Sequence, residues 1–280
     1  MMQEREYYGV RRGITPKTES INFEMFQMGF MMVYDKFATD GYFQKYLGKD
    51  CVDGVIPGII GRDVRTAVFF KVGKKLWPVY EMESTYEEVD YYTMIEFLYD
   101  CASKPTEFVY HEFAECGIHV RNSSDQLGRI EFREAINPIL KKFKKLALSE
   151  DGEILEAVEN GFEALFEAKI PTEDEEIQKR INQAQIKFRK TKSTVDDRRD
   201  ALRDLADVLE MLRPKIKTVL MSKDENDLFQ IANSFGIRHF NKKQKDEYDK
   251  PIWHAWIFYC YLATIHACLR LIEKQSSNPG

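Results

Sequence analysis

The chain has 280 residues and a formal net charge of −5; 44% of its residues are hydrophobic and 31% are charged. This composition excludes a disordered chain, and the length allows one large domain or two smaller ones. The acidic balance argues against a general polyanion-binding protein. Five cysteines without a C-x-x-C pair, and a charged N-terminus without an apolar core, predict a cytoplasmic protein with reduced thiols.

The first 170 residues are expected to form an α+β module. Apolar residues recur at helical spacing in three stretches, which are residues 22–38, 87–101 and 131–145. Four other features lie between or after them: a glycine-rich loop at 41–61, a strand or helix start at 65–72, a candidate strand at 117–121, and a hairpin turn at Asp151-Gly152. Ile170-Pro171 closes this module.

The remaining residues predict a helical bundle over residues 171–274, followed by a disordered tail at 275–280. Helical spacing of apolar residues recurs in four stretches, which are 172–190, 194–212, 224–235 and 252–274. Thr172 is expected to cap the first of these helices, and Pro214 to end the second. The predicted fold class is therefore mainly α, with an N-terminal α+β module (1–170) before the bundle.

The last predicted helix contains an uncharged run that has nearly the length of a membrane span. Residues 252–269 carry no formal charge, but His254 and His266 lie within the run. A helix that is apolar on all sides also suits the centre of a bundle or a dimer seam. We therefore expect no membrane contact and a homodimer formed through this C-terminal helix.

A cluster of Arg238, His239 and Asn241 precedes the last helix. Metal-independent RNA cleavage needs a base for the 2′-hydroxyl, which a histidine supplies near neutral pH, and a cation for the phosphate, which an arginine supplies. The alternative is structural: Arg238 caps a helix or pairs with a nearby acid, and His239 forms a hydrogen bond inside the bundle.

Two groups of basic residues are candidates for RNA binding. The first group is Lys187, Arg189 and Lys190, and the second, just after the Arg238 cluster, is Lys242 and Lys243. The first group follows an acidic stretch at 173–176, so the alternative is a solvated helix whose charges complement the helix dipole.

The sequence predicts neither a metal nor a cofactor. His111, Cys116 and His119 lie close together, but no fourth ligand stands at zinc spacing, so the trio is not a usual zinc pattern. His254 and His266 lie roughly 120° apart around their helix and cannot share a metal. The chain contains no Walker loop and no G-x-G-x-x-G.

The second half of the chain resembles the helical C-terminal region of bacterial abortive-infection proteins with HEPN-type domains. The residues that carry the resemblance are 196–210, 228–241 and 261–272, while 75–80 and 95–99 resemble the N-terminal module of AbiJ-type proteins. HEPN domains often cut RNA with an arginine, a following polar residue, and a histidine four to six residues after the arginine. Here Arg238 and His239 fit the first two places, and the next histidine is His254, sixteen residues beyond Arg238.

The resemblance implies phage defence by an RNA-directed toxin, with Arg238 as the phosphate-binding residue and His239 as the candidate base. Its implied partners are RNA and a phage or defence-system protein. A non-catalytic sensor or dimerisation module is the alternative. A third class is a small-molecule enzyme that uses the glycine-rich loop at 41–61.

Overall fold

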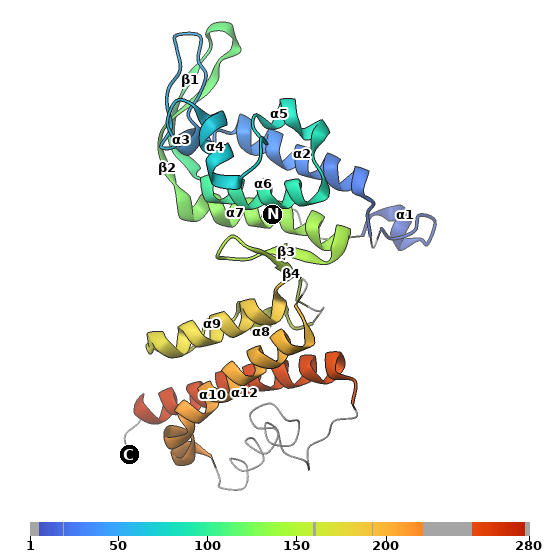
Figure 1. Ribbon diagram of the computed structural model, residues 1–280, viewed down its shortest axis with the longest axis vertical. Coiled ribbons are helices and arrows are strands. Elements are labelled where there is room, and N and C mark those ends of the chain that lie inside the picture. Colours follow the sequence, from blue (N-terminus) through green and yellow to red (C-terminus); the bar gives the residue numbers. More distant parts are fainter. Residues whose placement is uncertain (1–5, 19, 159–160, 192, 221–247, 278–280) are drawn as a thin grey trace. The chain divides into compact units, whose positions relative to one another are not determined.

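The computed structural model describes residues 6–18, 20–158, 161–191, 193–220 and 248–277 (Figure 1). Of these described residues 62% are in helices and 11% in strands, which confirms the mainly helical class with a small α+β element. It divides into two compact units, Met1–Ile154 and Leu155–Gly280. This division lies earlier in the chain than the boundary expected near Ile170.

The N-terminal unit is built on three long helices, α2 (Phe23–Thr39), α6 (Glu88–Cys101) and α7 (Asp125–Lys144). The short helical segment α1 (Tyr8–Arg11) precedes them, and others lie between them: α3 (Gln44–Leu47), α4 (Val64–Val72), α5 (Val79–Met82), η1 (Glu83–Thr85) and η2 (Phe113–Glu115). The segment at 65–72 is therefore a helix. Pro138 lies inside α7 without ending it.

Aromatic rings form the core of the N-terminal unit. Tyr91 of α6 is fully buried, and its ring meets those of Phe23, Phe26 and Phe30 of α2 edge-on, with centroids 5.1–5.7 Å apart. Edge-to-face packing is the favoured geometry for such pairs. Asn22 begins α2 by accepting a hydrogen bond from the backbone N–H of Met25. This close packing of rings fixes α2 against α6, and the loops of the unit start from these packed helices.

Two short antiparallel sheets complete the N-terminal unit and the start of the second unit. β1 (Lys104–His111) pairs with β2 (Gly117–Ser124), and β3 (Leu146–Leu148) pairs with β4 (Ile154–Glu156). The predicted strand at 117–121 and the hairpin turn at Gly152 are both confirmed. Gly152 has a φ of 87°, a left-handed conformation that glycine adopts without strain.

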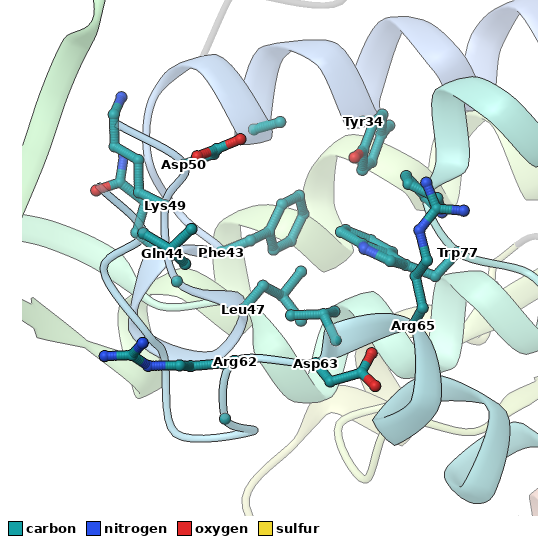
Figure 2. A pocket seen from close by; sticks show the side chains of 16 residues that line it. Tyr34, Phe43, Gln44, Leu47, Lys49, Asp50, Arg62, Asp63, Arg65 and Trp77 are labelled. Carbon is teal, nitrogen blue, oxygen red and sulfur yellow. The ribbon is translucent and has the colours of Figure 1, made fainter. Parts of the chain in front are cut away.

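The glycine-rich loop predicted at 41–61 holds α3 and then runs as an irregular segment, which we call the Cys51 loop (residues 48–61). An isolated bridge between Lys49 and Ile56 closes this loop. At Gly58 a Cβ atom would lie 2.3 Å from the backbone oxygen of Tyr46, so the close packing there requires glycine. The loop forms one side of a pocket whose other side is made by α2, α4 and Trp77 (Figure 2).

The second unit, which we call the helical unit, contains α8 (Glu163–Glu167), α9 (Glu175–Arg189), α10 (Val195–Val219) and α12 (Lys250–Ser277). α10 packs against both α9 and α12. It continues through Pro214, where the sequence predicted an end. The cap of α9 is Asp174 rather than Thr172, because the Asp174 carboxylate accepts hydrogen bonds from the N–H groups of Glu176 and Ile177.

The core of the helical unit is formed by an aliphatic stripe on α10, which includes Leu202, Leu205, Leu209 and Leu212. Phe188 of α9 stacks on Phe258 of α12 with ring centroids 4.0 Å apart. The four leucines of α10 recur every three or four positions, which is the spacing that places them on one face of the helix.

α12 is the apolar helix that the sequence singled out. Residues 250–275 are long and apolar enough to cross a membrane, but half of the most apolar window is buried inside the protein. His254 and His266 are both buried, with exposed fractions of 1% and 6%. This burial is compatible with a soluble protein. α12 also extends past the predicted helix end at Lys274.

Candidate metal centre

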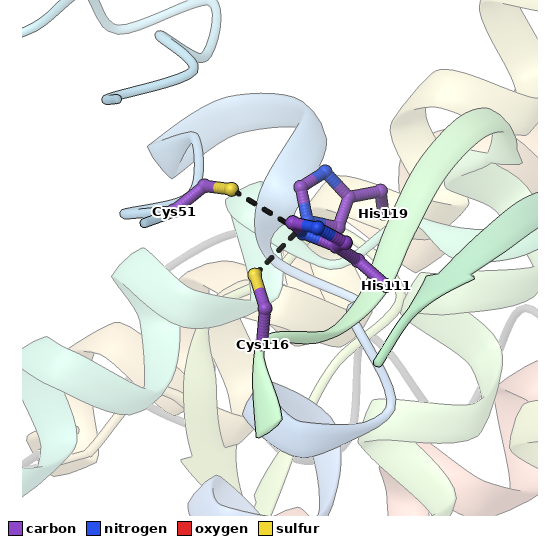
Figure 3. Close-up of side chains that lie close together, drawn as sticks. All are labelled: Cys51, His111, Cys116 and His119. Carbon is purple, nitrogen blue, oxygen red and sulfur yellow. Dashed lines mark hydrogen bonds between the residues drawn. The ribbon is translucent and has the colours of Figure 1, made fainter. Parts of the chain in front are cut away.

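Four side chains with metal-binding atoms converge in the N-terminal unit: Cys51, His111, Cys116 and His119 (Figure 3). One ligand atom from each residue lies within 4.8 Å of the others. Two contacts are shorter: Cys116 Sγ lies 3.1 Å from His119 Nε2, and Cys51 Sγ lies 3.7 Å from His111 Nδ1. Two thiols and two imidazoles therefore face one point.

The β1–β2 hairpin positions three of these four residues. His111 is the last residue of β1 and lies opposite Gly117, while His119 lies opposite Val109. His111 and His119 are thus diagonal neighbours on one face of the hairpin, where side chains of this length can meet. Their rings cross at 78° with centroids 5.3 Å apart. Cys116 stands in the turn just before β2 begins.

The turn of this hairpin has two residues with positive φ, Ala114 at 50° and Gly117 at 80°. An alanine in the left-handed region costs on the order of 1 kcal/mol or more. Such strain persists only where surrounding contacts fix the backbone. Here the strained residue lies two positions before Cys116, in the turn that brings Cys116 toward His119.

The Cys51 loop supplies the fourth side chain. The backbone N–H of Asp53 lies 3.5 Å from Cys51 Sγ, and it donates to that sulfur. Gly54, with a φ of 121°, lets the loop turn immediately afterwards. Lys49 Nζ donates to the backbone oxygen of Cys116 at 2.5 Å and so joins the loop to the hairpin turn. The loop and the hairpin are thus held together beside the cluster.

The surroundings of the cluster suit neutral imidazole ligands. Burial lowers the pKa of His119, and the positive charge of Lys49 lowers it further. Burial also raises the pKa of the Cys116 thiol, as does the neighbouring Cys51 sulfur. His111 Nε2 lies 3.7 Å from an Asp53 carboxylate oxygen. A histidine whose second nitrogen faces a carboxylate while the first faces the metal is a common arrangement in zinc sites.

The donor set fits Zn²⁺. Zinc–sulfur bonds of about 2.3 Å and zinc–nitrogen bonds of about 2.0 Å place tetrahedral ligand atoms roughly 3.3–3.8 Å apart. The 3.1 Å and 3.7 Å contacts are close to that range, and the other distances between the four ligand atoms are no more than 4.8 Å. Four protein ligands fill the coordination of zinc and are typical of a structural site, whereas catalytic sites keep one position for water or substrate.

The sequence missed this cluster because its fourth member is remote. Cys51 lies 60 residues before His111, and nothing in the local spacing indicates that the two meet. The signal that was present is the pattern H-x₄-C-x₂-H over residues 111–119. The expectation of no metal at these histidines thus rested on a missing fourth ligand, which the fold supplies.

Of the residues predicted to act on RNA, the structure describes only the group at Lys187, Arg189 and Lys190. Arg238, His239, Asn241, Lys242 and Lys243 lie outside the described residues, and their roles remain predictions.

The first basic group is described. Lys187 pairs with Asp204 at 2.5 Å, and Arg189 Nε donates to the backbone oxygen of Glu156 at 2.8 Å. Burial lowers the pKa of Arg189, whose guanidinium also lies over the Phe166 ring. Lys190 is exposed. These contacts favour a structural role for Lys187 and Arg189.

Comparison of the chain with protein-family models, curated proteins and solved structures gave no match. The function is therefore inferred from the residues and their geometry.

Proposed function

We propose that the N-terminal unit binds one Zn²⁺ through Cys51, His111, Cys116 and His119. The observation that carries this proposal is the convergence of the four donor atoms within 4.8 Å from two separate segments. The metal supplies a crosslink: it fixes the tip of the β1–β2 hairpin to the Cys51 loop. A two-stranded hairpin is only marginally stable in water by itself, so a bond of this kind keeps its tip ordered.

The test is the metal content of protein purified without added metal and without an affinity tag that binds metal. We expect one zinc per chain in the wild type and a loss of zinc in Cys116→Ser. Cys260→Ser is the matched control, because Cys260 is also half-buried but lies in the helical unit. Equal zinc contents in Cys116→Ser and Cys260→Ser would contradict the proposal.

For the whole chain we propose a cytoplasmic role in phage defence, with a HEPN-like C-terminal region acting on RNA. This proposal is supported by the residues of the resemblance at 196–210, 228–241 and 261–272. The helical unit is consistent with it, because α10 contains all of the first stretch, α12 contains all of the third, and the two helices pack directly against one another. In this role Arg238 binds a phosphate of the RNA, and His239 accepts the proton of the attacking 2′-hydroxyl. Asn241 positions the RNA strand.

Arg238→Ala and His239→Ala test the RNA-directed role. Each is expected to abolish growth arrest on expression in bacteria and RNA cleavage by the purified protein, while the circular dichroism spectrum is unchanged. Lys217→Ala, an exposed change at the end of α10, serves as the control. Toxicity equal to wild type in Arg238→Ala would contradict this assignment.

A non-catalytic module that dimerises through α12 is the second candidate, because α12 has a second apolar face. Trp253, Trp256, Ala263 and Ala267 are exposed in the described part of the chain and recur at spacings that suit a helix seam. Ala263→Glu is expected to convert a dimer into a monomer in sedimentation experiments, whereas Lys217→Glu leaves the dimer intact. An unchanged dimer in Ala263→Glu would exclude this seam.

A further inference from the structure

A pocket of about 540 Å³ opens beside α2 and the Cys51 loop in the N-terminal unit (Figure 2). Its volume falls in the range of small-molecule sites, which is about 300–1,000 Å³. It uses residues different from the four of the metal centre, although Lys49 and Asp50 bring the Cys51 loop to its rim.

Two polar groups of this pocket have no partner in the described part of the chain. Tyr34 is only 4% exposed and lines the pocket, but its hydroxyl makes no hydrogen bond there. Burial raises the pKa of this hydroxyl, so it remains a donor at neutral pH. The indole N–H of Trp77, a half-buried residue of the same lining, also makes no hydrogen bond. Neither atom is fully buried, so both meet the open space of the pocket and are available to a ligand acceptor.

The walls of the pocket are aromatic. Tyr34 stacks on Phe43 with ring centroids 6.0 Å apart and an interplanar angle of 16°. Figure 2 shows the Phe43 ring and the Trp77 indole extending toward the centre of the pocket from opposite sides. A flat aromatic ligand gains both burial and stacking against such walls, at about 1–3 kcal/mol for a nucleobase on an aromatic side chain.

Charged groups stand at the rim of the pocket. Arg62 is exposed and makes no ion pair in the described chain, and Arg65 makes an exposed pair with Glu81 that contributes little. Of the two carboxylates, Asp63 is engaged as the cap of α4, whereas Asp50 is exposed and has no partner. The pocket is lined by three cations, Lys49, Arg62 and Arg65, against the two carboxylates, which favours an anionic ligand that also carries hydrogen-bond donors.

We propose that this pocket binds a nucleotide. The base lies between Phe43 and Trp77, with its acceptor atoms toward the Tyr34 hydroxyl and the Trp77 N–H. The phosphate binds Arg62 and Arg65, for which the planar guanidinium is well suited. Asp50 accepts a hydrogen bond from a ribose hydroxyl or a base amino group. This proposal rests on the pocket residues and does not depend on the RNA-directed role of the helical unit.

Isothermal titration calorimetry with the full chain tests the proposal, using AMP, GMP, CMP and UMP, the nucleoside adenosine, and a 5′-phosphorylated tetra-adenylate. We expect at least one mononucleotide to bind at one site per chain, and adenosine to bind about tenfold or more weakly than AMP if AMP is that ligand, because it lacks the phosphate. Tighter binding of the tetranucleotide would identify an RNA end as the ligand, and tighter binding of the mononucleotide would identify a free nucleotide.

The variants separate this pocket from other surfaces. Arg62→Gln and Trp77→Leu are each expected to weaken binding about tenfold or more, and Tyr34→Phe to weaken it less. Arg121→Gln, an exposed arginine of β2 that does not line the pocket, is the control. Thermal melting checks that each variant is folded. Absence of binding by all the ligands in folded wild-type protein, or binding that is unchanged in both Arg62→Gln and Tyr34→Phe, overturns the proposal.

Discussion

The N-terminal unit packs aromatic rings around Tyr91, whereas the helical unit packs an aliphatic stripe of α10 between α9 and α12. The helical unit consists mainly of long helices with caps and periodic apolar residues. The N-terminal unit contains short helices, a two-stranded hairpin and an irregular loop, and its four metal-binding residues are half-buried between this loop and the hairpin. In our proposal the zinc crosslink stabilises the β1–β2 hairpin and the Cys51 loop, which the hydrophobic core of the N-terminal unit does not cover.

The hairpin illustrates this difference. Phe108, Tyr110 and Phe113 at its tip are more than half exposed, so apolar burial contributes little there. The side chain of Gln44 holds the start of β2, next to the turn, by donating to the Ile118 backbone oxygen and accepting from the Val120 N–H. Lys49 Nζ also donates to the backbone oxygen of Cys116 in the turn, beside the side chains of the metal centre.

The largest expected effect is the loss of the metal. Removing zinc with a chelator, or replacing Cys51 with serine, is expected to lower the stability of the N-terminal unit by about 4 kcal/mol when free zinc is about 1,000 times the dissociation constant. The midpoint of thermal unfolding falls by about 10 °C or more. Differential scanning calorimetry measures this, with Cys260→Ser as the control. A second transition, from the helical unit, should not move; an equal shift of both transitions would contradict the separate roles of the two units.

The converse test removes a core side chain from the helical unit. Leu205 is fully buried on α10, and Leu205→Ala is expected to cost about 3 kcal/mol, within the range of such truncations. Urea unfolding measures the loss, and the zinc content of the protein should not change. Met211→Ala, an exposed change on the same helix, should cost under about 0.5 kcal/mol. Loss of zinc in Leu205→Ala would show that the units do not fold separately.

A smaller effect is expected from a helix cap. The Thr194 hydroxyl accepts a hydrogen bond from the N–H of Asp197, and the Asp197 carboxylate accepts one from the N–H of Thr194. Thr194→Ala is expected to lower the stability of the helical unit by about 1 kcal/mol, and Thr194→Ser to preserve it. Urea unfolding at constant zinc distinguishes the two variants; equal losses in both would show that the cap does not stabilise α10.

The smallest expected effect concerns how the stability of the helical unit changes with pH. Burial lowers the pKa of His254 and of His266. The unfolded chain, with histidine pKa values near about 6.5, then binds more protons than the folded chain as the pH falls below that value, so the stability of the helical unit decreases over that range. In a Trp77→Phe background the fluorescence of Trp253 and Trp256 reports this unit.

Replacing both histidines with glutamine is expected to flatten the pH profile of the helical unit. The N-terminal unit should keep its own acid sensitivity, since protons compete with zinc for the cysteines and histidines. An unchanged profile in the double variant would show that these histidines do not set the pH dependence of the helical unit.

The same difference explains what the sequence could predict. The helices of both units follow from apolar residues at helical spacing, and the stripe of Leu202, Leu205 and Leu209 lies on the buried face as expected. The continuation of α10 through Pro214 did not follow, because packing of the stripe outweighs the local preference of proline to end a helix. β1 was missed because Pro105 lies within it, and proline argues against a strand.

The candidate metal centre depends on contacts between distant residues, which local spacing does not reveal. His111, Cys116 and His119 were visible as a group, but Cys51 joins them only through the fold of its loop. For Lys187 and Arg189 the sequence suggested a binding site, but the structure favours a structural role. Their sequence suggests a basic surface, whereas the structure pairs the first with Asp204 and turns the second toward Glu156 and Phe166.

X-ray absorption at the zinc edge of the purified full chain tests the central claim most directly. The four-residue centre predicts one zinc per chain, with two sulfur ligands at about 2.3 Å and two nitrogen ligands at about 2.0 Å. In Cys51→Ser the sulfur contribution should fall or the metal should be lost. Protein that is folded but contains no zinc, or zinc bound by oxygen and nitrogen alone, would contradict the account.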